Sequence, residues 1–411
     1  MVRAPRDSMT NGKRLLIYSH DSFGLGHLRR CRAIAHELVA EFENLSVLIL
    51  SGSPIIGSFD FRARVDFVRI PGVIKLRNGE YTSLALHIDI NKTLEIRSSI
   101  IEHTAEIFAP DIFLVDKEPL GLRGEVDSTL KLLRRSGTRC VLGLRDVMDD
   151  PAPLADEWKR KGVYPALKTH FDDIWVYGLP EIFDPVREIE NMSQFADKTH
   201  FTGYLRRAAS PDATPMYDFI LPEEPFILVT TGGGGDGSML IDLVLSAYEI
   251  DPTIPYNALV VLGPFMHADE RLAFQRRASV LSKVTIVTFD AHIERLFTRA
   301  VGVVTMGGYN TFCEIVSFQK PSLVVPRTKP RREQWLRSVR AEKLGILKLF
   351  DLEVLEPVAA MARELHDAAH WPRVSSFNKD RMLVGHERIA ELARADLTAD
   401  TKPPTIRTAV A

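Results

Sequence analysis

The chain has 411 residues, of which 45% are hydrophobic and 26% are charged, as in an ordinary globular protein. Its formal net charge of -2 gives no electrostatic case for nucleic-acid binding, which would need a basic face, so no nucleic-acid partner is expected. A chain of this length is too long for one typical hydrophobic core, so we expect two domains.

The cysteines and the N-terminal residues indicate the cellular compartment in which the protein is expected. Cys31, Cys140 and Cys313 lie far apart and form no metal-binding spacing, which argues for a reducing environment and against a structural zinc. The first residues lack the apolar core of a signal peptide, and no apolar run approaches the length of a membrane span. We therefore expect a cytoplasmic protein, and peripheral contact with the inner face of a membrane stays open.

In the first half of the chain, short apolar runs alternate with longer helical patterns. This alternation predicts a parallel sheet with crossover helices, in an N-terminal Rossmann-like domain over residues 13–207. Residues 1–12 are expected to be disordered. The expected strands are Leu15–Ser19, Val47–Ser51, Phe67–Ile70, Ile112–Asp116, Cys140–Leu144 and Ile174–Tyr177, and the main expected helices are His27–Phe42, Lys92–Phe108 and Gly124–Ser136.

A first glycine loop, FGLGHLRR at residues 23–30, opens this domain. Arg29 stands where a dinucleotide-binding fingerprint needs a small residue, which argues against NAD or FAD. Gly26 and His27 begin the following helix, whose positive end lowers the pKa of an imidazole and keeps it neutral. His27 is therefore a candidate general base, but a residue that only caps its helix fits the spacing equally well.

Two carboxylates follow strands of the predicted sheet. Asp116 ends the strand Ile112–Asp116, and Asp146 follows the strand Cys140–Leu144. Ligands of open α/β sheets bind at the carboxyl ends of the strands, so both residues are candidate catalytic groups. The alternative is that each forms an internal ion pair that orders its loop.

A segment rich in proline and small residues, 208–224, predicts a linker. After it we expect a C-terminal Rossmann-like domain over 225–379, a C-terminal helix over 380–398 and a disordered tail over 399–411. The expected strands of this domain are Phe226–Thr230, Ala258–Leu262, Val284–Phe289, Gly302–Thr305 and Ser322–Val325.

A second glycine loop, TTGGGGDGS at residues 230–238, opens the C-terminal domain. It lacks the Gly-Lys-Ser/Thr of a Walker motif, which makes an ATPase improbable. Consecutive glycines after a strand allow a ligand to approach the backbone closely, so Gly233 and Gly234 are candidate ligand contacts. An unused, pliable turn is the alternative.

The segment Val301–Arg327 predicts a βαβ unit with a glycine turn before its helix. The unpaired N–H groups at the start of that helix would bind an anion such as a diphosphate. Glu314 lies about one turn further along, where its carboxylate can accept hydrogen bonds from a ribose. The basic stretch after Pro326 is typical of a solvated helix face, but it brings Glu333 and Gln334 near the same site, where they could bind sugar hydroxyls.

The two glycine openings and the late βαβ unit resemble a two-domain nucleotide-sugar glycosyltransferase of the GT-B fold. The similarity is greatest to the family of the lipid-linked N-acetylglucosaminyltransferase of peptidoglycan synthesis, without gaps over residues 308–345. The resemblance implies two Rossmann-like domains whose parallel sheets face a central cleft, with Glu314 on the ribose and Gln334 on the donor sugar. It also implies that the first domain binds the acceptor and that the phosphates lie near Gly308, Tyr309, Asn310 and Thr311.

Three positions depart from the pattern or match it loosely. Gly234 replaces a serine of the family, and Glu333 stands where the family often has a second glutamine. The stretch TGYLRR at 202–207 resembles the Thr-Gly-Asn-Pro-x-Arg of the domain junction, which implies that Arg207 approaches the diphosphate. Around Gly26 and His27 the sequence is also similar to the hydrolase that removes UDP from a modified sugar in pseudaminic acid synthesis.

The resulting hypothesis is transfer of a hexose or N-acetylhexosamine from a UDP-sugar to an acceptor hydroxyl. His27 would act as base, and neither a metal nor a cofactor would be required, because helix N-termini stabilise the departing diphosphate. A hydrolase with water as acceptor and a non-catalytic nucleotide-sugar-binding protein are the alternatives. The acceptor, a saccharide, a lipid-linked sugar or a small molecule, is not encoded in a motif, and the segment Val73–Ile90 is either a lipid-facing patch or a cleft loop.

Overall fold

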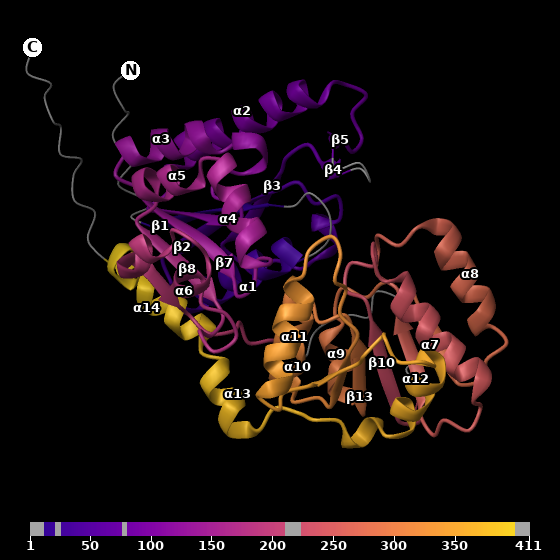
Figure 1. Ribbon diagram of the computed structural model, residues 1–411. Helices are drawn as coiled ribbons and strands as arrows, with labels where there is room; N and C mark the ends of the chain where they lie inside the picture. The colour runs from indigo at the N-terminus through magenta and orange to yellow at the C-terminus, as the bar shows by residue number, and fades with distance from the viewer. Residues whose placement is uncertain (1–11, 21–25, 76–79, 210–222, 399–411) are drawn as a thin grey trace, which may run out of the picture.

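The computed structural model describes residues 12–20, 26–75, 80–209 and 223–398. Two parallel β-sheets, each covered by helices, form two domains that lie side by side (Figure 1). The α/β class and the two Rossmann-like domains predicted from the alternating pattern are confirmed.

The first domain contains a seven-stranded parallel sheet. All six strands predicted from apolar runs are present: Ile112–Asp116 has the predicted bounds, and the other five differ only at their ends. The seventh, β9, is a three-residue strand at the edge of the sheet, too short to give a sequence signal. In the order in which they pair, the strands are β3 (Val65–Arg69), β2 (Leu45–Ser51), β1 (Lys13–Ser19), β6 (Ile112–Asp116), β7 (Arg139–Arg145), β8 (Asp173–Tyr177) and β9 (Thr199–Phe201).

Helices cover this sheet, and a small antiparallel hairpin projects from it. The hairpin pairs β4 (Val73–Lys75) with β5 (Tyr81–Ser83). It lies inside the segment Val73–Ile90, which the sequence predicted as either a lipid-facing patch or a cleft loop. The helices are α1 (Gly26–Glu41), α2 (Ile90–Phe108), α3 (Asp127–Arg135), α4 (Pro151–Arg160), α5 (Val163–His170) and α6 (Pro185–Glu188), with 3₁₀ turns at Ile56–Ser58, Leu122–Gly124 and Ser193–Lys198.

The second domain contains a six-stranded parallel sheet. In pairing order its strands are β12 (Val284–Val287), β11 (Asn257–Val261), β10 (Phe226–Thr230), β13 (Gly302–Thr305), β14 (Ser322–Val324) and β15 (Lys348–Leu349). Its helices are α7 (Ser238–Ile250), α8 (Ala268–Ala278), α9 (Glu294–Arg299), α10 (Tyr309–Phe318), α11 (Glu333–Lys343) and α12 (Pro357–His366), with a 3₁₀ turn at Ala368–His370. The five predicted strands are all present, and β15 is a two-residue addition.

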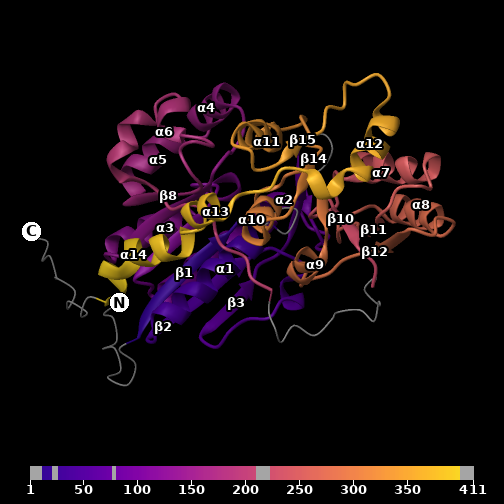
Figure 2. The ribbon, with the colours of Figure 1, turned by 90° about the horizontal axis from the view of Figure 1, so that it is seen from below.

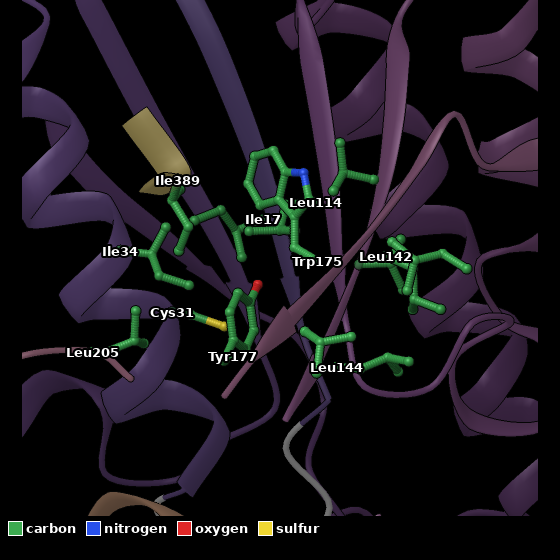
Figure 3. Packing of buried hydrophobic residues seen from close by; sticks show 14 of the residues in the cluster. Ile17, Cys31, Ile34, Leu114, Leu142, Leu144, Trp175, Tyr177, Leu205 and Ile389 are labelled. Atoms are coloured by element: carbon green, nitrogen blue, oxygen red, sulfur yellow. The ribbon is translucent and has the colours of Figure 1, made fainter. Parts of the chain in front are cut away.

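The C-terminal part of the chain returns to the first domain. The predicted helix over 380–398 is present as α14 (Gly385–Thr398), preceded by a separate helix α13 (Ser376–Met382). In two perpendicular views α14 lies beside the first domain, and α13 leads to it from beside α10 of the second domain (Figures 1 and 2). Figure 3 shows the Ile389 side chain of α14 beside those of Ile17 and Ile34, in the core of that domain. The first domain is therefore completed by residues far away in sequence.

The core strands of the first sheet are apolar on both faces, as expected for a parallel sheet covered by helices on each side. Trp175 and Tyr177 of β8 are almost completely buried and form part of this core (Figure 3). A Cβ atom at Gly143 of β7 would lie 2.1 Å from the Tyr177 hydroxyl oxygen, so only glycine fits beside that ring.

Several predicted segments lie outside the described residues. They are residues 21–25 of the first glycine loop, 210–222 of the linker and both terminal stretches. On the described side of the linker, the Tyr204 N–H donates to the Met382 carbonyl at 2.7 Å, and the Gly385 N–H donates to the Tyr204 carbonyl at 3.2 Å. The two chain crossings between the domains are thus hydrogen-bonded to each other.

Ion pairs join the two domains along α11 and the loop before it. The basic stretch that was predicted as a solvated face instead supplies arginines to carboxylates of the first domain. The pairs are Arg331–Glu157 at 3.2 Å, Arg332–Asp150 at 3.1 Å, Arg337–Asp146 at 2.6 Å and Arg340–Glu188 at 2.5 Å. Separately, none of the helices in the described ranges is both long and apolar enough to cross a membrane.

Candidate functional site

A cavity of about 410 Å³ lies between the two domains, and both contribute to its walls. Strand ends such as Thr230 and Thr305 border it, as expected for ligand sites of open α/β sheets. The predicted residues that line it are Gly26, His27, Gly233, Gly308, Tyr309, Asn310, Thr311, Glu314, Glu333 and Gln334. The predicted residues that do not line it are Asp116, Asp146, Arg207 and Gly234.

The start of α10 forms the second-domain wall of the cavity. Gly307 has a φ of +75° and turns the chain from β13 into the helix, while Gly308 occupies the N-cap position. No side chain caps this end, and a Cβ at Gly308 would meet nothing within 4 Å. The first N–H groups of the helix are thus left for an external partner, and an anion is the partner that the helix dipole favours.

The N-terminal ends of α10 and α1 are in direct contact at the cavity. The Asn310 amide Nδ2 donates to the Gly26 carbonyl at 3.1 Å, and its Oδ1 accepts from the Arg207 guanidinium at 2.8 Å. The Arg207 backbone N–H donates to the Ser317 hydroxyl at 2.9 Å. Arg207 therefore supports α10 from outside the cavity wall, so the approach to a diphosphate implied by the resemblance is indirect.

The second glycine loop forms another part of the wall. Gly233 lines the cavity, whereas Gly234 has a φ of +88° and packs against backbone. A Cβ at Gly234 would lie 2.4 Å from the Leu262 carbonyl oxygen, so this position is glycine because of close packing. The helix α7 that follows begins after Gly237, again without a side-chain cap. The loop thus adds a second uncapped helix start close to the cavity.

Glu314 is 1% exposed and forms an ion pair with Arg29 of α1, across the domain boundary. Arg29 also donates to Glu294 at 2.7 Å. Burial raises the pKa of the Glu314 carboxyl, and Arg29 opposes that rise. The predicted ribose-binding carboxylate is therefore held by a cation of the other domain.

His27 and Asp116 form a hydrogen-bonded pair at the first-domain wall. The His27 Nδ1 lies 2.5 Å from an Asp116 carboxylate oxygen. Arg30 donates to both oxygens of Asp116, at 2.8 and 2.7 Å. Burial opposes ionisation of Asp116, but Arg30 and His27 outweigh it, so the pKa of this carboxyl is lowered. Asp116 does not line the cavity itself and acts on it through His27.

The His27 ring is oriented so that one nitrogen remains for chemistry. We assign the Nδ1 proton to the hydrogen bond with Asp116, which leaves Nε2 unprotonated and able to accept a proton. Burial lowers the pKa of His27, and Asp116 opposes this shift. A second histidine, His20 at the end of β1, lies with its ring centroid 5.8 Å from that of His27. Burial lowers the pKa of His20 to about 3, so it is neutral as well.

Asp146 lies away from the cavity surface. Its two oxygens accept from Arg337 at 2.7 and 2.6 Å, and one also accepts from the Tyr204 hydroxyl at 2.9 Å. The geometry favours the internal ion pair over a catalytic role, because both carboxylate oxygens of Asp146 already accept hydrogen bonds from the protein. Strand-end position could not separate the two, since Arg337 comes from the other domain.

Glu333 and Gln334 begin α11 and line the cavity, as the sequence predicted. One oxygen of Glu333 accepts from Arg327 at 2.5 Å, and the Gln334 Oε1 accepts from the Arg327 backbone N–H at 3.1 Å. The Gln334 Nε2 makes no hydrogen bond to a described residue, so it is free to donate to a ligand.

Sequence reasoning missed two groups of lining residues. The first is an apolar end made of Phe59, Val261, Phe289, Ala291 and Ile293. The second is a set of arginines, Arg29, Arg30, Arg145, Arg327 and Arg337. The loop after β12 carries no motif, and the arginines could be recognised as site residues only once the two domains are brought together. In the described part of the chain, no three His, Cys, Asp or Glu side chains converge to hold a metal ion.

Comparison with known families bears on the second domain. Residues 226–365 match the glycosyltransferase family 28 C-terminal domain. This range contains the second glycine loop, the uncapped start of α10 and Glu314. A search of curated proteins gave no match.

Solved structures are similar along almost the whole chain. The glycotransferase of kitacinnamycin has a TM-score of 0.61 at 16% identity, over 94% of this chain and 99% of its own. The spinosyn forosaminyltransferase SpnP has a TM-score of 0.62 at 14% identity, over 94% and 99%. MurG of Acinetobacter baumannii has a TM-score of 0.54 at 11% identity, over 93% and 99%. These similarities confirm the GT-B fold, and residues 226–365 are similar to the C-terminal domain of glycosyltransferase family 28, which together support an enzyme of glycosyl transfer.

Proposed function

We propose that this protein transfers a hexose or an N-acetylhexosamine from a UDP-sugar to an acceptor hydroxyl. The observation that carries the proposal is that His27, paired with Asp116, and the uncapped start of α10 line the same cavity. The first domain offers a base for the acceptor, and the second domain offers an anion site for the leaving group.

The donor would lie along the second domain. Its diphosphate would accept hydrogen bonds from the first N–H groups of α10, and its ribose would donate to Glu314. The apolar end around Phe289 and Ile293 suits a planar base, while the free Nε2 of Gln334 suits a sugar hydroxyl. Uridine as the base rests on the resemblance of residues 308–345 and remains a proposal.

In the proposed reaction, His27 Nε2 removes the proton of the acceptor hydroxyl as its oxygen bonds to C1 of the donor sugar. The bond between C1 and the diphosphate oxygen breaks, and the diphosphate leaves with that electron pair. Asp116 holds the His27 ring in the required tautomer and stabilises the imidazolium that forms. The N–H groups of the helix start and the nearby arginines stabilise the negative charge on the leaving group, so this step needs no metal.

We also propose a cytoplasmic location with contact to the inner face of a membrane. The predicted segment Val73–Ile90 includes residues 76–79, which lie outside the described residues. Its described part supports the contact, because Leu84, Leu86 and Ile88 are exposed by 39%, 45% and 41%. Sedimentation of the full-length protein with anionic lipid vesicles would test it. The same protein remaining wholly in the supernatant would contradict the membrane contact.

The donor half of the proposal is tested by calorimetry with UDP. We expect Glu314→Gln to weaken UDP binding about tenfold, because the amide cannot replace a charged acceptor of two ribose hydroxyls. Glu391→Gln, on the exposed face of α14, is the matched control and should bind UDP normally. Unchanged UDP affinity in Glu314→Gln would refute the ribose assignment.

The reaction itself is tested by UDP release from a panel of UDP-sugars, with and without cell extract as a source of acceptor. Release that depends on extract supports a transferase, whereas equally fast release without extract supports a hydrolase that uses water. His27→Ala should bind UDP normally and lose most of its turnover. Near-full turnover in this variant would exclude His27 as the base.

A further inference from the structure

Two cations at neighbouring strand ends of the first domain lack close counter-ions. Arg145 ends β7 and lines the cavity, and Lys117 directly follows β6. The carboxylate nearest to Arg145 is Glu333 at 3.7 Å, and the one nearest to Lys117 is Glu118 at 3.6 Å. Both separations exceed a hydrogen bond, and neither side-chain cation donates one to a described residue.

The other arginines of the cavity differ from Arg145 in this respect. Each of them donates a hydrogen bond to a carboxylate of the protein. These pairs are Arg29–Glu294 at 2.7 Å, Arg30–Asp116 at 2.7 Å, Arg327–Glu333 at 2.5 Å and Arg337–Asp146 at 2.6 Å. Arg145 is therefore the lining arginine whose charge remains available for a ligand.

Partial burial makes the two unpaired charges costly. The Arg145 side chain is 17% exposed and that of Lys117 is 14% exposed. The Arg145 Nε is fully buried without a hydrogen-bond partner. Burial lowers the pKa of Lys117 to about 8 and that of Arg145 to about 10. A cation removed from water without an acceptor is unfavourable, and an anionic ligand would supply the missing acceptor.

The backbone holds Lys117 in this position at a further cost. Its φ is +72°, in the left-handed region that non-glycine residues avoid, and its N–H donates to the Gly143 carbonyl of β7 at 2.7 Å. This hydrogen bond ties the end of β6 to the neighbouring strand. Strain of this kind is concentrated at ligand and catalytic sites.

Both cations belong to the first domain, which the proposed reaction assigns to the acceptor. Arg145 lines the same cavity as His27, whereas Lys117 lies behind the lining residues, directly after Asp116, the residue that holds His27. The proposed diphosphate site is at the start of α10, in the second domain. The groups that would hold an anion in the first domain are thus different from those that would hold the diphosphate.

We propose that Lys117 and Arg145 bind an anionic group, a carboxylate or a phosphate, on the acceptor. This inference rests on the proposed function, because it assumes that the donor diphosphate occupies the second domain. The pair would place the acceptor with its reacting hydroxyl toward His27. It would also select against acceptors that lack a negative charge, since an empty site leaves two partly buried cations without a hydrogen-bonded carboxylate.

The test uses full-length protein saturated with UDP, so that the diphosphate site is filled. Inorganic phosphate and acetate are titrated in parallel at constant ionic strength and followed by calorimetry. We expect saturable binding of at least one anion, weakened at least tenfold in Lys117→Met and in Arg145→Met. The anion that binds more tightly identifies the acceptor group as phosphate or carboxylate. Lys131→Met, on the exposed face of α3, is the control and should bind like the wild type.

Absence of saturable anion binding to the UDP-saturated protein, or equal binding in all variants, would overturn the inference. Failure of the proposed function has a different signature, because UDP itself would then not bind to the wild type. Thermal melting checks the variants. In anion-free buffer Arg145→Met should melt no lower than the wild type, since it removes a charge without a hydrogen-bonded partner. A melting temperature lowered as much as that of Arg337→Met would show that Arg145 is a structural residue and would also overturn the inference.

Discussion

The role of Asp146 can be decided by removing its carboxylate. Asp146 and Arg337 are each at most 1% exposed, and two hydrogen bonds of 2.7 and 2.6 Å join them across the domain boundary. In Asp146→Ala, Arg337 would keep only the Gly307 carbonyl at 2.9 Å, and the Tyr204 hydroxyl would lose its acceptor. Removing one partner of a buried pair costs about 3–5 kcal/mol, because the other charge stays buried.

A cost of this size corresponds to a fall in melting temperature on the order of 10 °C for a domain of about 200 residues. Differential scanning calorimetry of the wild type and Asp146→Ala measures it. The double variant Asp146→Ala, Arg337→Met completes the cycle. We expect it to melt above Asp146→Ala, because the second substitution removes the charge that was left uncompensated.

If Asp146→Ala melts like the wild type but loses UDP release at 20 °C, Asp146 acts in the reaction, as its position at a strand end first indicated. If the double variant melts no higher than the single one, the ion pair is not the reason for the loss. Arg388→Ala, on the exposed face of α14, controls for removing an arginine.

Three further outcomes follow from the structure. Asp116→Asn should lower UDP release by about 10²–10⁴-fold with UDP binding retained, because His27 loses the partner that sets its tautomer; release within tenfold of the wild type would contradict this. Since burial lowers the pKa of His27 from its ordinary value of 6.5, the base is already unprotonated at neutral pH. UDP release should therefore be flat above that pH and fall in acid, and a steady rise between pH 7 and 9, measured in the same assay, would exclude His27. Ile389→Ala should cost about 2–5 kcal/mol in urea unfolding, although Ile389 belongs to the last helix, and a loss no greater than that of Arg388→Ala would argue against its place in the first core.

The sequence predicted the sheets well, because a strand that is buried on both faces appears in the sequence as a continuous apolar run. Ile112–Asp116, Phe226–Thr230 and Gly302–Thr305 are observed with the bounds predicted from their apolar runs. The strands β9 and β15 show no such run, since two or three residues at a sheet edge need little burial. The return of α14 to the first domain was also invisible. Its apolar positions show that it is buried, but they do not show on which domain.

The candidate site was likewise predictable only where its features are local in sequence. Glycine turns and helix starts are local, so Gly308 and His27 could be recognised from a few neighbouring letters. Ion-pair partners that belong to the other domain could not be recognised in this way. Arg29 reaches Glu314 from α1, and the charge state of Glu314 depends on that contact. The sequence could therefore predict which residues are present at the site, but it could not predict which of them are free to bind a ligand.

The interdomain ion pairs link the architecture to the proposed chemistry. The buried pair of Asp146 and Arg337 is little affected by salt, whereas the more exposed pairs of Arg332 and Arg340 are screened. A buried ion pair contributes little net stability, but a broken one is costly, so it favours one relative position of the two domains over its alternatives. That position is the one in which α1 and α10 start at the same cavity. Charges outside the reaction centre thus hold together the two halves of a site that neither domain could form alone.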